Sequence, residues 1–164
     1  MSATSTDGLV ILNPLTDLTL RASAESTAIT AVAAVEVSGF GGFSKILFEL
    51  AVTAVSLTGG SAPTAQLRVW VQRKTPQGQW DDLLALQTAT MLSAAAALYH
   101  VAEYPGPVAA GPTPALVQDA GGAPPFAPRG GWISDALRAK AIIIVTGAPT
   151  AQSVTWALYA RGRA

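Results

Sequence analysis

The sequence contains no cysteine, and this absence excludes several kinds of site at once. Without thiols the chain can form no disulfide framework, no thiolate zinc site and no cysteine nucleophile. No apolar run approaches the ~20 residues that a membrane-spanning helix needs, so we expect no membrane span and no membrane partner. The first eight residues lack the basic and long apolar regions of a signal peptide, and we expect the chain to stay where it is synthesised.

Charged residues are also scarce, and the two signs balance. Ten Lys and Arg residues offset ten Asp and Glu residues, which together make up 12% of the 164 residues. Neither sign clusters, so no electric field gathers phosphates or anionic lipids, and a nucleic-acid partner is not expected. A free monomer of this size usually carries about a quarter of charged residues. The low charge therefore indicates that some apolar surface meets a partner protein.

Period-two alternation of apolar and polar residues is the main structural signal. It is clearest in residues 67–74, where leucine and valines alternate with arginine, tryptophan and glutamine. Further strands are expected at 17–22, 29–37, 45–57, 80–90, 99–104, 140–146 and 154–159. The alanine-rich residues 91–97 could form one or two helical turns. Short strands joined by Gly/Pro turns predict an all-β fold, a single antiparallel β-sandwich of the jelly-roll or immunoglobulin-like kind.

The domain plan is one β-sandwich over residues 17–164, preceded by a flexible N-terminal arm at 1–16 and interrupted by a loop at 105–131. That loop holds seven prolines and six glycines in 27 residues, a composition that excludes a core strand. Loops longer than about 15 residues are uncommon in compact domains and are usually functional or disordered. We expect the arm and the loop to contact neighbouring subunits, with a disordered surface loop as the alternative. The contact residues expected are Pro124, Pro125 and Phe126 in the loop and Trp132 directly after it.

The glycine-rich segments are interpreted as turns. Residues 39–42 and 59–61 neither open a helix after a strand nor carry the lysine of a phosphate-binding loop. Residues 75–78, Thr-Pro-Gln-Gly, have the composition of a hairpin loop, in which Pro76 presets φ and glycine adopts a left-handed conformation. We therefore expect a positive φ at Gly78.

No group of residues in the sequence amounts to an active site. His100 is the only histidine, and an isolated imidazole needs a partner group to do chemistry, so we interpret it as structural or surface-exposed. Asp81 and Asp82 are neighbours on a strand, whose side chains point to opposite faces, and we expect a solvated hairpin flank. Asp119 has no second carboxylate near it to complete a calcium site. We expect no catalytic residue, no metal and no cofactor.

The tryptophans leave two interpretations open, a hydrophobic core or a stacking platform for sugar rings. Trp156 is in phase with Val154 and Leu158, which predicts a core position. Trp70 faces away from the valines beside it, so it either packs under the edge of the second sheet or is exposed as a protein-contact residue. A carbohydrate-binding or adhesive module would use exposed tryptophans with polar partners, but acidic residues and asparagine are scarce near them.

The hairpin at residues 67–83, a strand followed by a Pro-X-Gly turn, tryptophan and Asp-Asp-Leu, resembles a hairpin common in β-sandwich virion proteins of tailed bacteriophages. Residues 40–58 and 154–158 are similar to the strands that flank it in those proteins. The resemblance covers about half of the chain, roughly residues 28–90 plus the final strand. The loop at 105–131 has no counterpart in the family pattern.

The resemblance implies a function as well as a fold. It implies a non-enzymatic capsid decoration (cement) protein that binds the major capsid protein or another virion protein as a homo-oligomer, with a trimer favoured. Such a protein would be made in the host cytoplasm and would lie on the capsid surface of the virion. A minor structural protein of the tail or of the head–tail junction is the alternative within the same family.

Overall fold

The computed structural model describes residues 16–30, 32–92, 98–104 and 133–163. The expected helical turns at 91–97 and the loop at 105–131 therefore lie almost wholly outside the described residues. The same holds for the expected N-terminal arm at 1–16, of which only the last residue is described, as the first residue of a strand.

Every regular element in the described residues is a β-strand, which agrees with the predicted fold class. The long strands match the expected ones closely, and most of them extend by one to four residues beyond the predicted limits, whereas the strand expected at 80–90 ends at Gln87. The elements are β1 (Thr16–Ser26), β2 (Val32–Ala33), β3 (Val37–Ser38), β4 (Lys45–Thr58), β5 (Thr64–Lys74), β6 (Trp80–Gln87), β7 (Leu98–Tyr104), β8 (Ala136–Thr146) and β9 (Ala151–Arg163).

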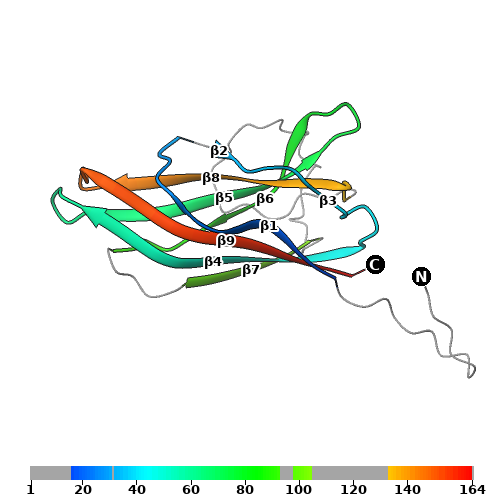
Figure 1. Cartoon of the computed structure of the whole chain (residues 1–164), viewed down its shortest axis with the longest axis horizontal. Coiled ribbons are helices and arrows are strands. Elements are labelled where there is room, and N and C mark those ends of the chain that lie inside the picture. The colour runs from blue at the N-terminus through cyan, green and yellow to red at the C-terminus, as the bar shows by residue number, and fades with distance from the viewer. Residues whose placement is uncertain (1–15, 31, 93–97, 105–132, 164) are drawn as a thin grey trace, which may run out of the picture.

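The strands form two antiparallel sheets that pack face to face, so the predicted β-sandwich is confirmed. One sheet has four strands in the order β1-β9-β4-β7. The other has the order β2-β8-β5-β6, with β3 also paired to β8. Figure 1 shows the two layers, with β8, β5 and β6 above β9, β4 and β7.

The core forms because each long strand alternates between an inner and an outer face. In β4, Ile46, Phe48 and Leu50 are fully buried, whereas Lys45 before them and Leu47 between them are exposed. Burying each such large apolar side chain contributes roughly 1.5–3 kcal/mol to stability. The largest fully buried side chains are Phe40, Ile46, Phe48, Leu50, Leu67, Leu83, Leu84, Met91, Leu137, Ile143 and Leu158.

Two connections carry the chain from one sheet to the other at the same end of the sandwich, one from β4 to β5 and one from β8 to β9 (Figure 1). They contact each other through the backbone: Ser61 N donates to Gly147 O at 2.9 Å, and Thr150 N donates to Thr58 O at 2.8 Å. The approach is so close that a Cβ on Gly60, which has a φ of +75°, would collide with the Gly147 carbonyl oxygen. This corner therefore requires glycine on both connections.

The strand expected at residues 29–37 is wrong for most of its length. Only the two-residue strands β2 and β3 pair there, both with β8, and the backbone between them makes one further bond, from Ala34 N to Ala139 O at 2.7 Å. Ile29, Val32 and Val35 are exposed, with Val35 at 83%. β-Branched residues favour a strand only where a sheet buries them, and here only Ala34 and Val37 are half-buried against the core.

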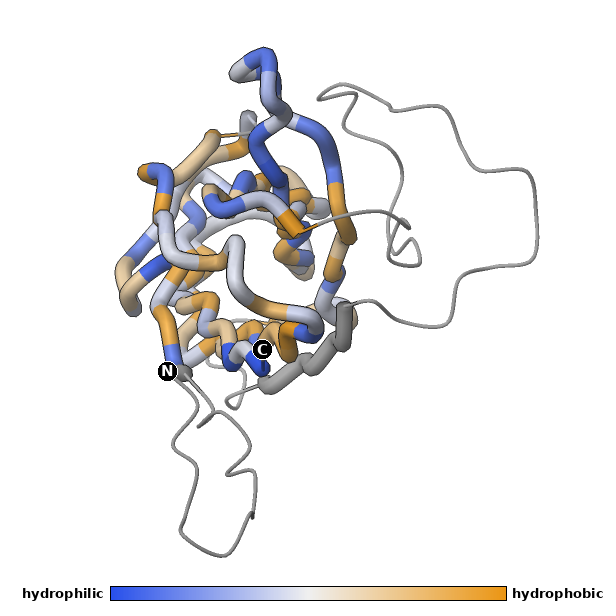
Figure 2. Tube along the Cα trace, turned by 90° about the vertical axis from the view of Figure 1, so that its right-hand side faces the viewer, coloured by the Kyte–Doolittle hydropathy of each residue, from blue (hydrophilic) through white to orange (hydrophobic). Residues whose placement is uncertain are grey.

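The β5–β6 hairpin folds as its turn residues predict. Gly78 N donates to Thr75 O at 2.8 Å, and Thr75 N donates to Gln79 O at 2.7 Å. Gly78 has a φ of +80°, so the expected positive φ is confirmed. The hairpin extends away from the rest of the sandwich (Figure 1), and its tip is hydrophilic (Figure 2).

The solvated flank expected for Asp81 and Asp82 is wrong, because both are buried at 1% exposure. They do point to opposite faces, as expected, and each meets a polar group there. Arg73 binds Asp81 Oδ2 through Nε and Nη2, both at 2.9 Å, and Gln72 Nε2 donates to Asp82 Oδ1 at 2.6 Å. Buried carboxylates need such partners, and the opposite strand β5 supplies them at the paired positions.

We expect replacement of Gly78 by valine to lower the free energy of unfolding by about 1–2 kcal/mol, because a β-branched residue is strained at this φ. No atom lies within 4 Å of the added Cβ, so crowding does not contribute. Gly42→Val is the matched control: its Cβ also meets nothing within 4 Å, but its φ is not in the left-handed region. Urea denaturation measures both, and equal loss in the two variants would contradict the assignment of the turn.

We expect Arg73→Leu to destabilise the protein by about 3–5 kcal/mol, because it leaves the buried carboxylate of Asp81 without its cation. Asp81 Oδ1 already has no hydrogen-bond partner among the described residues. The double variant Arg73→Leu/Asp81→Leu removes both charges and should recover most of the loss. Chemical denaturation of the two variants decides the matter: a double variant as unstable as the single one would show that the charge is not the cause.

Candidate interaction groove on the four-stranded sheet

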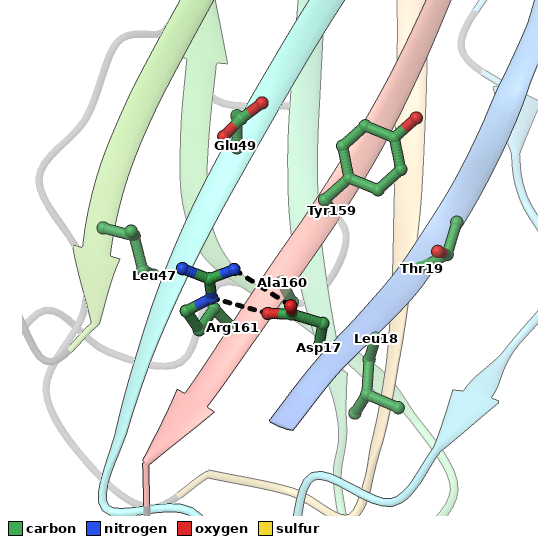
Figure 3. A pocket seen from close by; sticks show the side chains of 8 residues that line it. All are labelled: Asp17, Leu18, Thr19, Leu47, Glu49, Tyr159, Ala160 and Arg161. Carbon is green, nitrogen blue, oxygen red and sulfur yellow. Dashed lines mark hydrogen bonds and ion pairs between the residues drawn. The ribbon is translucent and has the colours of Figure 1, made fainter. Parts of the chain in front are cut away.

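A shallow groove of about 280 Å³ lies on the outer face of the four-stranded sheet, across strands β1, β9 and β4. The side chains that line it form two rows across the strands, because strand register places outward-pointing residues of neighbouring strands side by side. The first row is Asp17, Arg161 and Leu47, and the second is Thr19, Tyr159 and Glu49. Figure 3 shows these side chains around the groove. We call this surface the β1-β9-β4 groove.

An ion pair closes one side of the groove. Arg161 Nε donates to Asp17 Oδ1 at 2.6 Å and Arg161 Nη2 donates to Asp17 Oδ2 at 2.9 Å, which is the bidentate geometry that arginine and carboxylate prefer. The hydrogen bond from Arg161 lowers the pKa of Asp17. The same bond, followed by the charges of Asp17 and Glu49, raises the pKa of Arg161. Both groups therefore stay ionised over the ordinary pH range.

The other side of the groove is formed by Glu49, Tyr159 and Leu47. Glu49 is half-buried, and no hydrogen bond or ion pair joins its carboxylate to another described residue. Tyr159 stands beside it on β9 and is 40% exposed, and Leu47 is 39% exposed. The groove thus combines an aromatic face, an aliphatic side chain and a carboxylate on a rigid sheet.

A second opening, of about 240 Å³, lies where β1 approaches β8 at the edge of the sandwich. Arg21 lies over the ring of Trp156, 3.9 Å from its centroid, and donates to the Trp156 carbonyl and, at 3.1 Å, to the Ala24 carbonyl. Partial burial lowers the pKa of Arg21. Trp156 is 2% exposed, which confirms the predicted core position. Arg21 has a structural role at this edge, because its guanidinium donates hydrogen bonds to backbone carbonyl oxygens.

Trp70 is only 3% exposed, so the exposed placement considered for it is not observed. It lies on the outer face of β5 with Arg68 and Lys140 at 5.9 and 6.0 Å from its ring centroid. Trp80 on β6 has Arg138 at 4.2 Å and is half-buried. These long cationic side chains cover the rings, which leaves no open stacking platform on the described part of this sheet. The other contact residues, Pro124, Pro125, Phe126 and Trp132, lie outside the described residues and stay predictions.

His100 is on β7, paired with Leu50 of β4, and Asp119 lies outside the described residues. Within the described ranges, no group of three or more His, Cys, Asp or Glu residues could hold a metal ion. Nor does that part of the chain contain a helix long and apolar enough to cross a membrane.

Sequence reasoning missed the groove because its rows join residues far apart in the chain. Asp17 and Arg161 are separated by 144 positions, and only the β1–β9 pairing unites them. One local signal was available: Tyr159 and Arg161 are out of phase with the buried set Val154, Trp156 and Leu158 on the same strand. That phase places them outward but does not say which strands flank them.

The Asp17–Arg161 pair predicts a specific pH response. Arg161→Leu should raise the pKa of Asp17 back toward its ordinary value, measured by NMR titration of the carboxyl carbon. Because the folded-state pKa of Asp17 is lowered, the pair stabilises the fold above the unfolded pKa, and this contribution is lost as pH falls through the folded pKa. The melting temperatures of wild type and variant should therefore converge in acid. An unchanged Asp17 titration in the variant would show that the arginine is not its main partner.

Comparison with known proteins assigns no family to the chain. No family model matches the sequence, and no curated protein matches it significantly. Among solved structures, a chain in the structure of infectious bursal disease virus, Gx strain, aligns with 99% of this chain at 8% sequence identity and a TM-score of 0.40. The alignment covers 36% of that viral chain, so this chain spans about a third of its length.

Proposed function

We propose that the protein is a non-enzymatic structural protein of a virion, which binds and stabilises a bacteriophage capsid as an oligomeric decoration protein. The observation that carries the proposal is the β5–β6 hairpin. Its sequence resembles virion β-sandwich proteins, and its turn, paired strands and buried Asp81 and Asp82 form one continuous structural unit. A sandwich with such a hairpin suits a protein that works by presenting surfaces to other subunits.

The use of the carboxylates supports a structural role rather than catalysis. Asp81 binds Arg73, Asp82 accepts from Gln72, and Asp17 is held by Arg161. Asp135 similarly accepts from the backbone of the turn at residues 39–41. In each case the acid joins two strands or a strand and a turn, which is a positioning task within the fold.

Two features support binding to other protein subunits. The low charged fraction of 12% leaves apolar surface to be covered, and the β1-β9-β4 groove exposes Leu47 and Tyr159 on a rigid face. The partners we propose are the major capsid protein or another virion protein, together with further copies of this chain, with a trimer favoured. The site of action is the capsid surface.

The proposal predicts that the Pro/Gly-rich loop contributes to assembly. Replacing residues 107–128 with a short Gly/Ser linker should preserve the β-sandwich, judged by circular dichroism, while lowering the native mass in light scattering or weakening co-sedimentation with capsids of the encoding phage. A Gly/Ser linker is more flexible than a proline-rich sequence, so its ordering against a neighbour costs more entropy.

A Phe126→Ala variant keeps the length of the loop, and so separates loss of one side chain from the effect of truncation. It tests whether the expected apolar anchor matters by itself. If the linker variant assembles and binds capsids with unchanged stability, the loop has no binding role. If the intact chain neither self-associates nor binds capsids, the proposed function is wrong.

A further inference from the structure

We propose that the β1-β9-β4 groove receives the cationic side chain, arginine or lysine, of a neighbouring protein subunit. The inference rests on the proposed function in one respect, namely that the cation belongs to a protein subunit. The chemistry of the groove depends on its own residues alone, and a free peptide tests it without a virion.

The charge of the groove favours a cation. Asp17 and Glu49 contribute two negative charges and Arg161 one positive charge, so the groove carries a net charge of about −1. Arg161 is neutralised by its bidentate bonds to Asp17, at 2.6 and 2.9 Å. Glu49 has no such partner among the described residues and is close enough to Arg161 to raise its pKa. An unpaired carboxylate in a half-buried position attracts a cation and repels an anion.

Tyr159 supplies the second recognition element. It is 40% exposed, and strand register places it directly beside Glu49 on one side and Thr19 on the other, as Figure 3 shows. A cation over an aromatic ring next to a carboxylate gains from both groups at once. Leu47, 39% exposed, offers an aliphatic surface for the methylene stem of a long side chain.

The groove has room for a single long side chain. Its volume of about 280 Å³ is below the roughly 300–1,000 Å³ of pockets that hold drug-sized molecules. All three strands that form it are continuous members of one sheet, so the groups are held at fixed positions. A rigid, small, negatively charged site with an aromatic wall fits one arginine or lysine head group.

The test uses the full chain and two blocked tripeptides, acetyl-Gly-Arg-Gly-amide and the same peptide with citrulline in place of arginine. Citrulline keeps the shape of the side chain and removes its charge. Followed by NMR, the arginine peptide should shift the resonances of Tyr159 and its neighbours with a Kd of roughly millimolar order, since one exposed contact is weak. The citrulline peptide should bind at least about fivefold more weakly. Raising the ionic strength from about 10 to 150 mM should weaken binding of the arginine peptide.

Variants locate the binding. Glu49→Gln and Tyr159→Leu should each weaken binding of the arginine peptide by about two- to fivefold. Tyr159→Phe, which keeps the ring, should leave its affinity unchanged. Glu25→Gln is the matched control: it makes the same charge change on exposed β1 outside the groove and should have no effect. Melting temperatures check that all four variants fold.

Equal binding of the two peptides, or no binding of either, overturns the inference. So does a result in which neutral monosaccharides shift Tyr159 and the arginine peptide does not, because the groove would then be a sugar site. Failure of the proposed function is distinguishable: a chain that binds the arginine peptide through Glu49 but never attaches to capsids keeps its cation site and loses the virion role.

Discussion

The backbone contact between the two sheet-switching connections is the constraint on which the sandwich depends. Strands β4 and β9 pair in one sheet and β5 and β8 in the other, so both connections must cross between layers at the same end. They can do so only where the chains approach without side chains, at Gly60 and Gly147. Next to this corner, β4 and β9 pair from Thr58↔Ala151 to Ala54↔Thr155. A register shift between Val52 and Ala54 separates that stretch from the rows of the groove, which follow from the β4–β9 pairing beyond the shift and from the β1–β9 pairing.

The outer faces of the two sheets differ in kind. On the five-stranded sheet, cationic side chains lie over Trp70 and Trp80, and Gln72 joins Asp82 to Arg138 in a buried polar network. On the four-stranded sheet, polar and aromatic groups stay exposed around the groove. Covered aromatics add stability and specificity to the fold, whereas exposed ones remain free to bind. This contrast is why the groove, and not the tryptophan face, is the better candidate for recognition.

Local physics explains the successes and failures of prediction from sequence. Alternation in β4 and β5 identified strands correctly, because a period of two places alternate residues on one buried face wherever the sheet lies. The turn at Gly78 was predictable because its conformation depends on adjacent residues alone. The strand predicted at 29–37 was wrong because β-branched residues form a strand only where a sheet buries them. The solvent exposure predicted for Asp81 and Asp82 was wrong because their burial depends on Arg73 and Gln72 across the hairpin.

The sequence by itself therefore determined the fold class, most of the strands, the hairpin turn and the core position of Trp156, since each follows from spacing within one segment. Only the tertiary structure decided which strands became neighbours. It brought Asp17 to Arg161 and Tyr159 to Glu49, and it buried Trp70 under side chains from two strands. The physical reason is range: alternation acts over a few residues, whereas the groove requires pairings between segments more than 100 residues apart, which only sheet register specifies.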